Sequence, residues 1–216
     1  MDYKQKYLKY KNKYLKLKQF AGSKIPAEQI THKVLKGHKK RIYSVAFNNG
    51  KDDPNPGTKI VSGAFDRTIR VWNALTGVLE QTLGEDQYDD FNSVAFNHDG
   101  TKIVSGSFQK RIHVWNSLTG KVELILGSEE DDEHDPLKNH DVALNHDGTK
   151  IVSGSVNKII RVWNALTGEV DKILKGHTAP VWSVRFNHDG TKIVSGSYDA
   201  TIRVWNALTG VLEQTL

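Results

Sequence analysis

The chain has 216 residues, no cysteine and a hydrophobic fraction of 38%. This length accommodates one domain or two small ones, and the absence of cysteine excludes disulfides, thiolate nucleophiles and cysteine-ligated zinc. No apolar run reaches the roughly 18 to 20 residues that span a bilayer, and no apolar stretch follows the basic N-terminus as in a secretory signal. The composition therefore predicts a soluble, intracellular protein of the cytoplasm.

The net charge of +5 divides between two oppositely charged regions. Residues 1–40 carry twelve lysines and two acidic residues, a net charge of +10, so residues 41–216 carry a net charge of −5. Any attraction of the chain to nucleic acid or to an anionic membrane would therefore depend on the N-terminal segment.

The first 31 residues predict a short basic α-helix followed by a linker. Over residues 1–21, large apolar side chains recur at the 4-3-4-3 spacing of a helical seam, among seven lysines. The seam consists of Tyr3, Tyr7, Tyr10, Tyr14 and Leu17. Residues 22–31 begin with Gly-Ser-Lys-Ile-Pro, which is typical of a break and linker.

Four interpretations of the basic helix stay open. Two heptads are few for a coiled coil, and an isolated helix of this length is marginal in water, so the segment either packs on another helix or is an unstructured tail. Alternatively, residues 1–18 attract an anionic membrane or the phosphates of RNA. The segment resembles the Lys/Tyr/Leu-rich leaders of giant amoeba-virus (mimivirus-like) proteins, which would place the chain in a host cytoplasm.

Residues 32–216 contain four copies of one repeat. The string Gly-Thr-Lys-Ile-Val-Ser-Gly occurs four times and leads each time to Val-Trp-Asn and then Leu-Thr-Gly. The tryptophans of successive copies are 43, 48 and 42 residues apart, close to the roughly 40–45 residues of a four-stranded propeller blade. We place the repeats at 37–83, 84–126, 127–174 and 175–216, with an additional strand at 32–36.

Each repeat predicts four short strands, as the last copy illustrates. Val181–Phe186 and Lys192–Ser197 are apolar runs joined by Asn-His-Asp-Gly, and Asp-Gly between two such runs is a strong hairpin signal. Thr201–Asn206 and Val211–Leu216 then flank the Leu-Thr-Gly turn. Such a sheet has two faces to cover, so we expect consecutive sheets to pack on one another.

These repeats resemble the WD40 family over residues 32–216. The first and last copies carry the Gly-His pair of that family, Gly37-His38 and Gly176-His177, and all four end on Trp-Asn where the family usually has Trp-Asp. The resemblance implies an all-β fold of four four-stranded WD40-type β-propeller blades, preceded by the short basic α-helix. It also implies a surface of loops and strand ends that binds protein partners.

The family pattern links a histidine, a serine, an aspartate and a tryptophan of one blade by hydrogen bonds. Carried over to this sequence, it implies two structural sets: His38, Ser62, Asp66 and Trp72 in the first repeat, and His177, Ser195, Asp199 and Trp205 in the fourth. The second and third repeats lack the histidine and have Gln109 and Asn157 at the aspartate position. The two losses coincide because a buried carboxylate without its imidazole partner would be costly.

The sequence predicts no catalytic, metal or cofactor site. A Ser-His-Asp trio invites a hydrolase interpretation, but the same trio at the same place in two repeats favours a structural role. The three Asn-His-Asp-Gly turns each offer one histidine and one aspartate on separate repeats, which do not make a metal coordination shell. We therefore expect neither an enzyme nor a small-molecule substrate.

Two positions of each repeat form a candidate partner-binding face. In the family, the residue before the Ser-Val pair and the residue before the Asp/Gln/Asn position lie on the face that commonly holds ligands. In the first, second and fourth repeats these positions hold Tyr43, Phe65, Asn92, Phe108, Trp182 and Tyr198. The third repeat is degenerate in its first strand, where His140 is the nearest equivalent, and has Val156 at the second position. Aromatic residues there suit a hot spot for a protein or peptide partner; alternatively, they pack against neighbouring blades.

Closure of the propeller has three solutions. Four blades are few for this family, which typically has seven, and the strand at 32–36 duplicates a strand that the last repeat already has. The chain forms an open arc with exposed edges, completes an eight-bladed ring as a homodimer, or is a truncated remnant. The homodimer is favoured as a physical solution.

The sequence thus predicts a non-catalytic WD-repeat scaffold that mediates protein–protein interactions. One alternative is an adaptor tethered to an anionic membrane or nucleic acid through the basic helix. The other is a truncated, non-functional propeller fragment.

Overall fold

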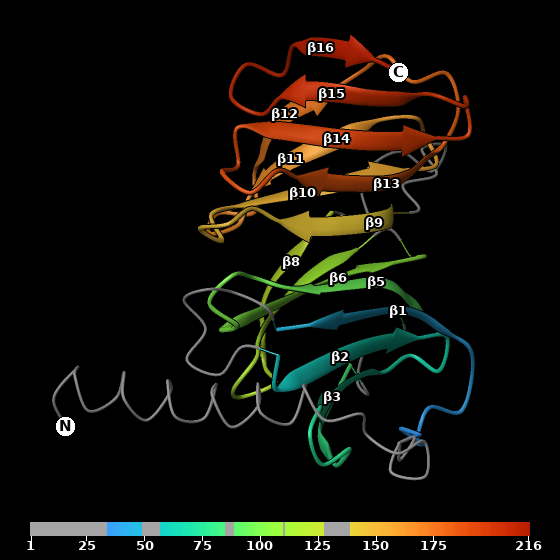
Figure 1. Ribbon diagram of the computed structural model, residues 1–216, viewed down its shortest axis with the longest axis vertical. Coiled ribbons are helices and arrows are strands. Elements are labelled where there is room, and N and C mark those ends of the chain that lie inside the picture. Colours follow the sequence, from blue (N-terminus) through green and yellow to red (C-terminus); the bar gives the residue numbers. More distant parts are fainter. Residues whose placement is uncertain (1–33, 49–56, 85–88, 110, 128–138) are drawn as a thin grey trace, which may run out of the picture. The chain divides into compact units, whose positions relative to one another are not determined.

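The computed structural model describes residues 34–48, 57–84, 89–109, 111–127 and 139–216 (Figure 1). The chain divides into two units, Met1–Leu35 and Lys36–Leu216. The helix predicted over residues 1–21 and the linker over 22–31 lie outside the described residues. Of the additional strand predicted at 32–36, residues 34–36 are described, and they are not part of a strand.

The described part of Lys36–Leu216 contains sixteen strands in four antiparallel sheets, each with its four strands in chain order. The first sheet consists of β1 (Ile42–Phe47), β2 (Lys59–Ala64), β3 (Ile69–Asn73) and β4 (Leu79–Leu83), and the second of β5 (Phe91–Phe96), β6 (Lys102–Ser107), β7 (Ile112–Asn116) and β8 (Val122–Leu126). The third consists of β9 (Asn139–Leu144), β10 (Lys150–Ser155), β11 (Ile160–Asn164) and β12 (Val170–Leu174), and the fourth of β13 (Val181–Phe186), β14 (Lys192–Ser197), β15 (Ile202–Asn206) and β16 (Leu212–Thr215).

The prediction of all-β, four-stranded repeats is confirmed for these residues. In the last repeat, every strand begins and ends within one residue of the limits expected from the sequence. The sheets follow one another in chain order from the blue end of the colour scale to the red (Figure 1). The first strand of each later sheet packs against the first and second strands of the sheet before it.

The Asn-His-Asp-Gly turns fix the hairpin between the first and second strands. In the second sheet, Gly100 adopts φ 72°, a left-handed conformation that glycine accepts without steric cost, and its N–H donates to the Asn97 carbonyl at 3.1 Å. The Asp99 carboxylate accepts the N–H of Thr101 at 2.9 Å and its hydroxyl at 2.5 Å. Because side chains of the turn satisfy its backbone, the register of the hairpin is set locally.

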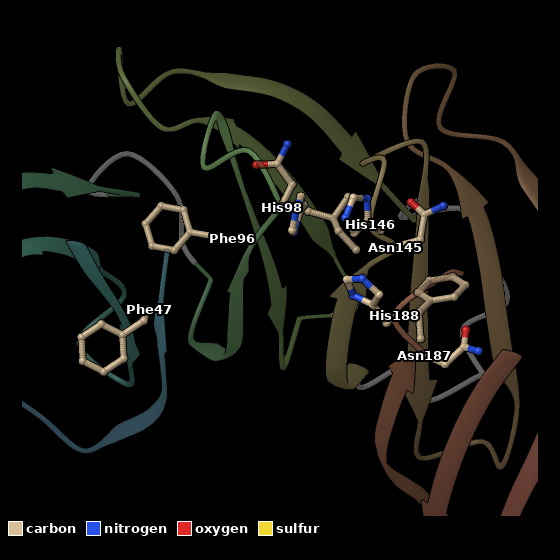
Figure 2. Close-up of a pocket in the computed structure, with 10 residues that line it drawn as sticks. Phe47, Phe96, His98, Asn145, His146, Asn187 and His188 are labelled. Atoms are coloured by element: carbon tan, nitrogen blue, oxygen red, sulfur yellow. The ribbon is translucent and has the colours of Figure 1, made fainter. Parts of the chain in front are cut away.

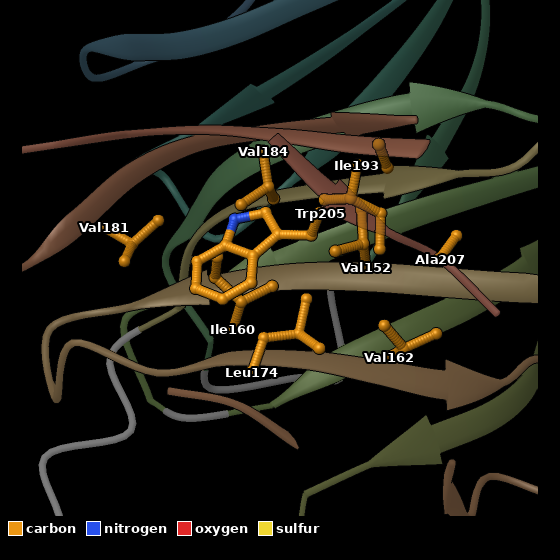
Figure 3. Close-up of a cluster of buried hydrophobic side chains, with 10 residues drawn as sticks. Val152, Ile160, Val162, Leu174, Val181, Val184, Ile193, Trp205 and Ala207 are labelled. Carbon is orange, nitrogen blue, oxygen red and sulfur yellow. The ribbon is translucent and has the colours of Figure 1, made fainter. Parts of the chain in front are cut away.

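The core lies between consecutive sheets, in three similar clusters. Figure 3 shows the cluster between the third and fourth sheets, where the Trp205 indole lies among Val152, Ile160, Leu174 and Val184. All five side chains are at most 3% exposed. Burying each of them stabilises the fold by about 1.5–3 kcal/mol, so a sheet depends on its neighbour for much of its stability.

Candidate partner-binding surface

The fourth sheet contains a continuous chain of hydrogen bonds. His177 Nδ1 lies 2.7 Å from Asp199 Oδ2, His177 Nε2 lies 2.8 Å from Ser195 Oγ, and Trp205 Nε1 donates to the same hydroxyl at 2.9 Å. The serine oxygen accepts from the indole, so its proton is directed at Nε2, and the imidazole donates from Nδ1 to the carboxylate. Every polar atom along this chain is thereby satisfied.

Hydrogen bonds also determine the ionisation of Asp199. Burial alone would raise the pKa of this carboxyl. The Thr201 hydroxyl, the Thr178 N–H and His177 all donate to it and outweigh burial, so its pKa lies well below the usual range. The carboxylate is therefore ionised throughout the neutral and mildly acidic range.

The first sheet repeats the arrangement. His38 Nδ1 lies 3.0 Å from the Asp66 carboxylate and Nε2 lies 2.7 Å from Ser62 Oγ, which also accepts Trp72 Nε1–H at 2.8 Å. Burial lowers the pKa of His38 despite the opposing effect of Asp66, so the ring is neutral at pH 7. In the first sheet and in the fourth, the structure thus brings together the four residues of the set that the family pattern implied.

The middle sheets keep the tryptophan–serine bond without the histidine. Trp115 and Trp163 donate to Ser105 and Ser153, each at 2.9 Å. Gln109, at the aspartate position, accepts the Asp90 backbone N–H at 2.8 Å.

A buried histidine of the second sheet was not predicted from the sequence. His113 on β7 is 0% exposed, stacks on Trp115 at a centroid distance of 5.4 Å and places Nε2 3.3 Å from the Asp89 carboxylate. Burial and, secondarily, the charge of Arg111 lower its pKa to about 4. The available signal was the departure from the other repeats, which have Arg70, Arg161 and Arg203 at this position.

A polar contact between sheets was also not predicted from the sequence. The Asp141 carboxylate on β9 accepts the hydroxyls of Ser93 at 2.8 Å and Ser183 at 3.1 Å and the N–H of Val184 at 3.0 Å, and it forms an ion pair with Arg185. Asp141 therefore connects the second, third and fourth sheets. Its signal in the sequence is an aspartate at the position where the other repeats have serine before valine.

The candidate partner-binding face is divided into two aromatic groups. Tyr43, Phe65 and Phe108 form one group, with ring centroids 5.4–6.4 Å apart, contributed by the first and second sheets. Trp182 and Tyr198 of the fourth sheet form the other, at 4.9 Å. Tyr43, Trp182 and Tyr198 are 42%, 43% and 70% exposed, whereas Asn92 is buried at 8%.

Two cations lie beside the first aromatic group. Arg41 Cζ is 5.9 Å from the Tyr43 ring centroid and 5.5 Å from that of Phe65, and Lys40 Nζ is 5.3 Å from Phe65. These distances are within the range of cation–π attraction. This group therefore combines apolar rings with positive charge, although residues 41–216 are acidic overall.

The histidines of the three Asn-His-Asp-Gly turns gather at one pocket of about 260 Å³ (Figure 2). The ring centroids of His98 and His146 are 3.6 Å apart, and those of His146 and His188 are 5.1 Å apart. Their place on separate repeats gave no sign of this proximity, which depends on how successive sheets pack. Among the described residues, no group of three or more histidine, cysteine or acidic side chains is arranged to hold a metal ion.

Four successive four-stranded antiparallel sheets, each with a tryptophan bonded to the serine of its second strand, define a protein built of β-propeller blades. The family model "WD domain, G-beta repeat" (WD40) matches residues 29–73, 77–116, 134–164 and 168–206, more than half of the chain, and the chain belongs to this family.

THO complex subunit 3 of Arabidopsis thaliana is 41% identical to the chain over 49 residues. The alignment covers 23% of this chain and 14% of that relative, so the two share a short segment. In the part of the chain that the structure describes, no helix has the length and apolar character needed to cross a membrane.

Proposed function

We propose that this WD40 chain is a non-catalytic scaffold that binds a protein or peptide partner through its aromatic face. The carrying observation is the cluster of Tyr43, Phe65 and Phe108 with Arg41 and Lys40 beside it. Aromatic and arginine side chains dominate binding hot spots, and the aromatic ones offer large contact area at low conformational-entropy cost. The two cations suit a peptide that places a carboxylate next to an apolar or aromatic side chain.

The two Ser-His-Asp sets support a structural role. Ser62 and Ser195 are 3% and 1% exposed, and each hydroxyl is bonded to both an indole N–H and an imidazole. A nucleophile must reach its substrate, and these hydroxyls lie inside their sheets. Their duplication in two repeats is also unlike a single active site.

Membership of the WD40 family and the short similarity to a subunit of a multiprotein complex both support a protein partner. The cysteine-free composition supports function in the cytoplasm.

Selection of a random peptide library on the 216-residue chain tests this proposal. We expect selected peptides to bind at least about tenfold more weakly to Tyr43→Ala and to Trp182→Ala, as for hot-spot residues. Leu118→Ala is the control, because Leu118 is an apolar side chain that is more accessible than either test residue, 78% exposed, in a turn outside the aromatic face. Equal affinity for all three variants would refute the assignment of the face.

A second candidate function uses the N-terminal segment, whose net charge of +10 over residues 1–40 favours anionic surfaces. In this case the chain is an adaptor tethered to a membrane or to RNA. Binding to anionic vesicles or to RNA would then weaken steeply with salt and disappear on deletion of residues 1–24. Binding that survives the deletion would exclude this role.

A further inference from the structure

The outer face of the fourth sheet exposes side chains that are buried in every other repeat. Val194 on β14 and Ile202 on β15 are 40% and 48% exposed. The equivalent side chains of the other three sheets are all 0% exposed: Val61, Val104, Val152, Ile69, Ile112 and Ile160. In those sheets the first strand of the next sheet covers them, as Val181 and Val184 cover the third sheet (Figure 3).

The first sheet exposes the complementary half of this junction. Ile42 and Val45 on β1 are 49% and 65% exposed. Their equivalents in the fourth sheet, Val181 and Val184, are 0% exposed because they pack against the third sheet. The two exposed faces therefore carry the two halves of the apolar junction that joins successive sheets within the chain.

A glycine of the second strand makes room for that junction. A Cβ atom at Gly63 would lie 2.8 Å from Val94 Cγ1, and a Cβ atom at Gly154 would lie 2.9 Å from Val181 Cγ1, both too close for real atoms. At Gly196, the equivalent in the fourth sheet, a Cβ atom would meet nothing within 4 Å. The fourth sheet thus keeps the space for a neighbour's first strand, although nothing in the described chain fills it.

Hydrogen bonds between the sheets recur in the same register. The side chain of Ser44 accepts the Val94 N–H at 3.1 Å, that of Ser93 accepts the Val142 N–H at 3.1 Å, and that of Asp141 accepts the Val184 N–H at 3.0 Å. Ser183 holds the same position in the fourth sheet. By the same register, its acceptor would meet the N–H of the residue equivalent to Val184 in a following sheet, which is Val45 in the first sheet.

We propose that the outer face of β14 and β15 binds the outer face of β1 of a second copy of this chain. Ile42 and Val45 of one protomer cover Gly196 of its partner, and the Val45 N–H donates to Ser183 Oγ. The contact is head-to-tail, so two copies form two identical junctions and close a ring of eight blades, within the range of known propellers. This proposal is independent of peptide binding and covers two apolar faces that would otherwise favour aggregation.

The test is the mass of the full 216-residue chain by light scattering during size-exclusion chromatography, over a range of concentrations. We expect a discrete dimer. Gly196→Val and Val45→Asp should each raise the dissociation constant at least about tenfold, the first by filling the junction and the second by burying a charge in it. Both positions are open in the single chain, so circular dichroism should stay unchanged. Leu208→Ser, which removes an apolar side chain 79% exposed in a turn, should leave the dimer intact.

Mixing the two variants tests the head-to-tail geometry. A Val45→Asp chain keeps its fourth-sheet face and a Gly196→Val chain keeps its first-sheet face, so the mixture regains one intact junction and forms a mixed dimer. A monomeric wild-type chain, a dimer that resists both variants, or open polymers that grow with concentration would each overturn the proposal. A mixture that stays monomeric would overturn the head-to-tail contact.

Discussion

Removing the Ser195 hydroxyl should destabilise the fourth sheet more than its size suggests. Ser195→Ala leaves the Trp205 indole N–H and His177 Nε2 without their shared partner, at sites that are 2% and 6% exposed. An unsatisfied buried polar group costs about 1–3 kcal/mol. His177 keeps its bond to Asp199, so we expect a total loss of about 2–4 kcal/mol in the free energy of unfolding. Ser153→Ala leaves only the Trp163 N–H without its acceptor and should lower the free energy of unfolding by about 1–2 kcal/mol.

A double-mutant cycle within the fourth sheet avoids the comparison of two serines that lie in different sheets. The cost of Ser195→Ala is measured by urea unfolding in the wild type and in a His177→Ala background. In that background it should fall to the cost of Ser153→Ala, which corresponds to a coupling energy of about 1–2 kcal/mol. Native-state hydrogen exchange of amides in β13–β16 assigns the loss to the fourth sheet. An equal cost of Ser195→Ala in both backgrounds would refute the idea that the histidine and serine act as a unit.

Three further predictions concern acid stability, a buried histidine and a junction. The pKa of Asp199 is lowered from 3.8, so its contribution to stability is complete above pH 3.8 and is lost as the pH falls towards the pKa of the folded state. Asp199→Asn should therefore flatten the acid limb of a curve of unfolding free energy against pH. The pKa of His113 is about 4, so the free energy of unfolding should fall as the pH decreases from 6.5 to 4. The NMR titration of His113 should show a midpoint near 4, and a midpoint above 6.5 would show that the Asp89 carboxylate outweighs burial. Gly63→Ala should lower the free energy of unfolding by about 1–3 kcal/mol by pushing on Val94, and an unchanged urea midpoint would contradict the packing between the first two sheets.

The fold could be predicted because its determinants are local and repeated. The Asp-Gly turns fix the hairpin between the first two strands in three of the repeats, and the recurring strings such as Lys192–Ser197 mark the strands themselves. The four sheets follow from these signals even though one repeat is degenerate in its first strand. The residues of the His-Ser-Asp-Trp sets could be named from the resemblance because all four members belong to one repeat.

Features that depend on the packing between sheets could not be predicted in the same way. The proximity of His98, His146 and His188 arises from turns 48 and 42 residues apart, and sequence spacing carries no angle between sheets. The contacts of Asp141 likewise come from two neighbouring sheets. In the sequence, the histidines were visible only as recurring residues of the Asn-His-Asp-Gly turns, and Asp141 only as a departure from the serine of the other repeats.

Differences between the repeats distinguish surface from scaffold once burial is known. Most of the strings that recur unchanged lie in strands or tight turns, whereas exposed positions such as Tyr198 vary freely. Among the buried positions that vary, His113 lies beside Asp89, and Asp141 pairs with Arg185, which replaces an alanine of the other three repeats. At Asp141 the polar change is accompanied by a complementary one, because an unpaired buried charge would cost several kcal/mol. The faces proposed to meet between two copies retain the apolar residues and the glycine of the internal junctions, so burying these positions would leave no charge unpaired.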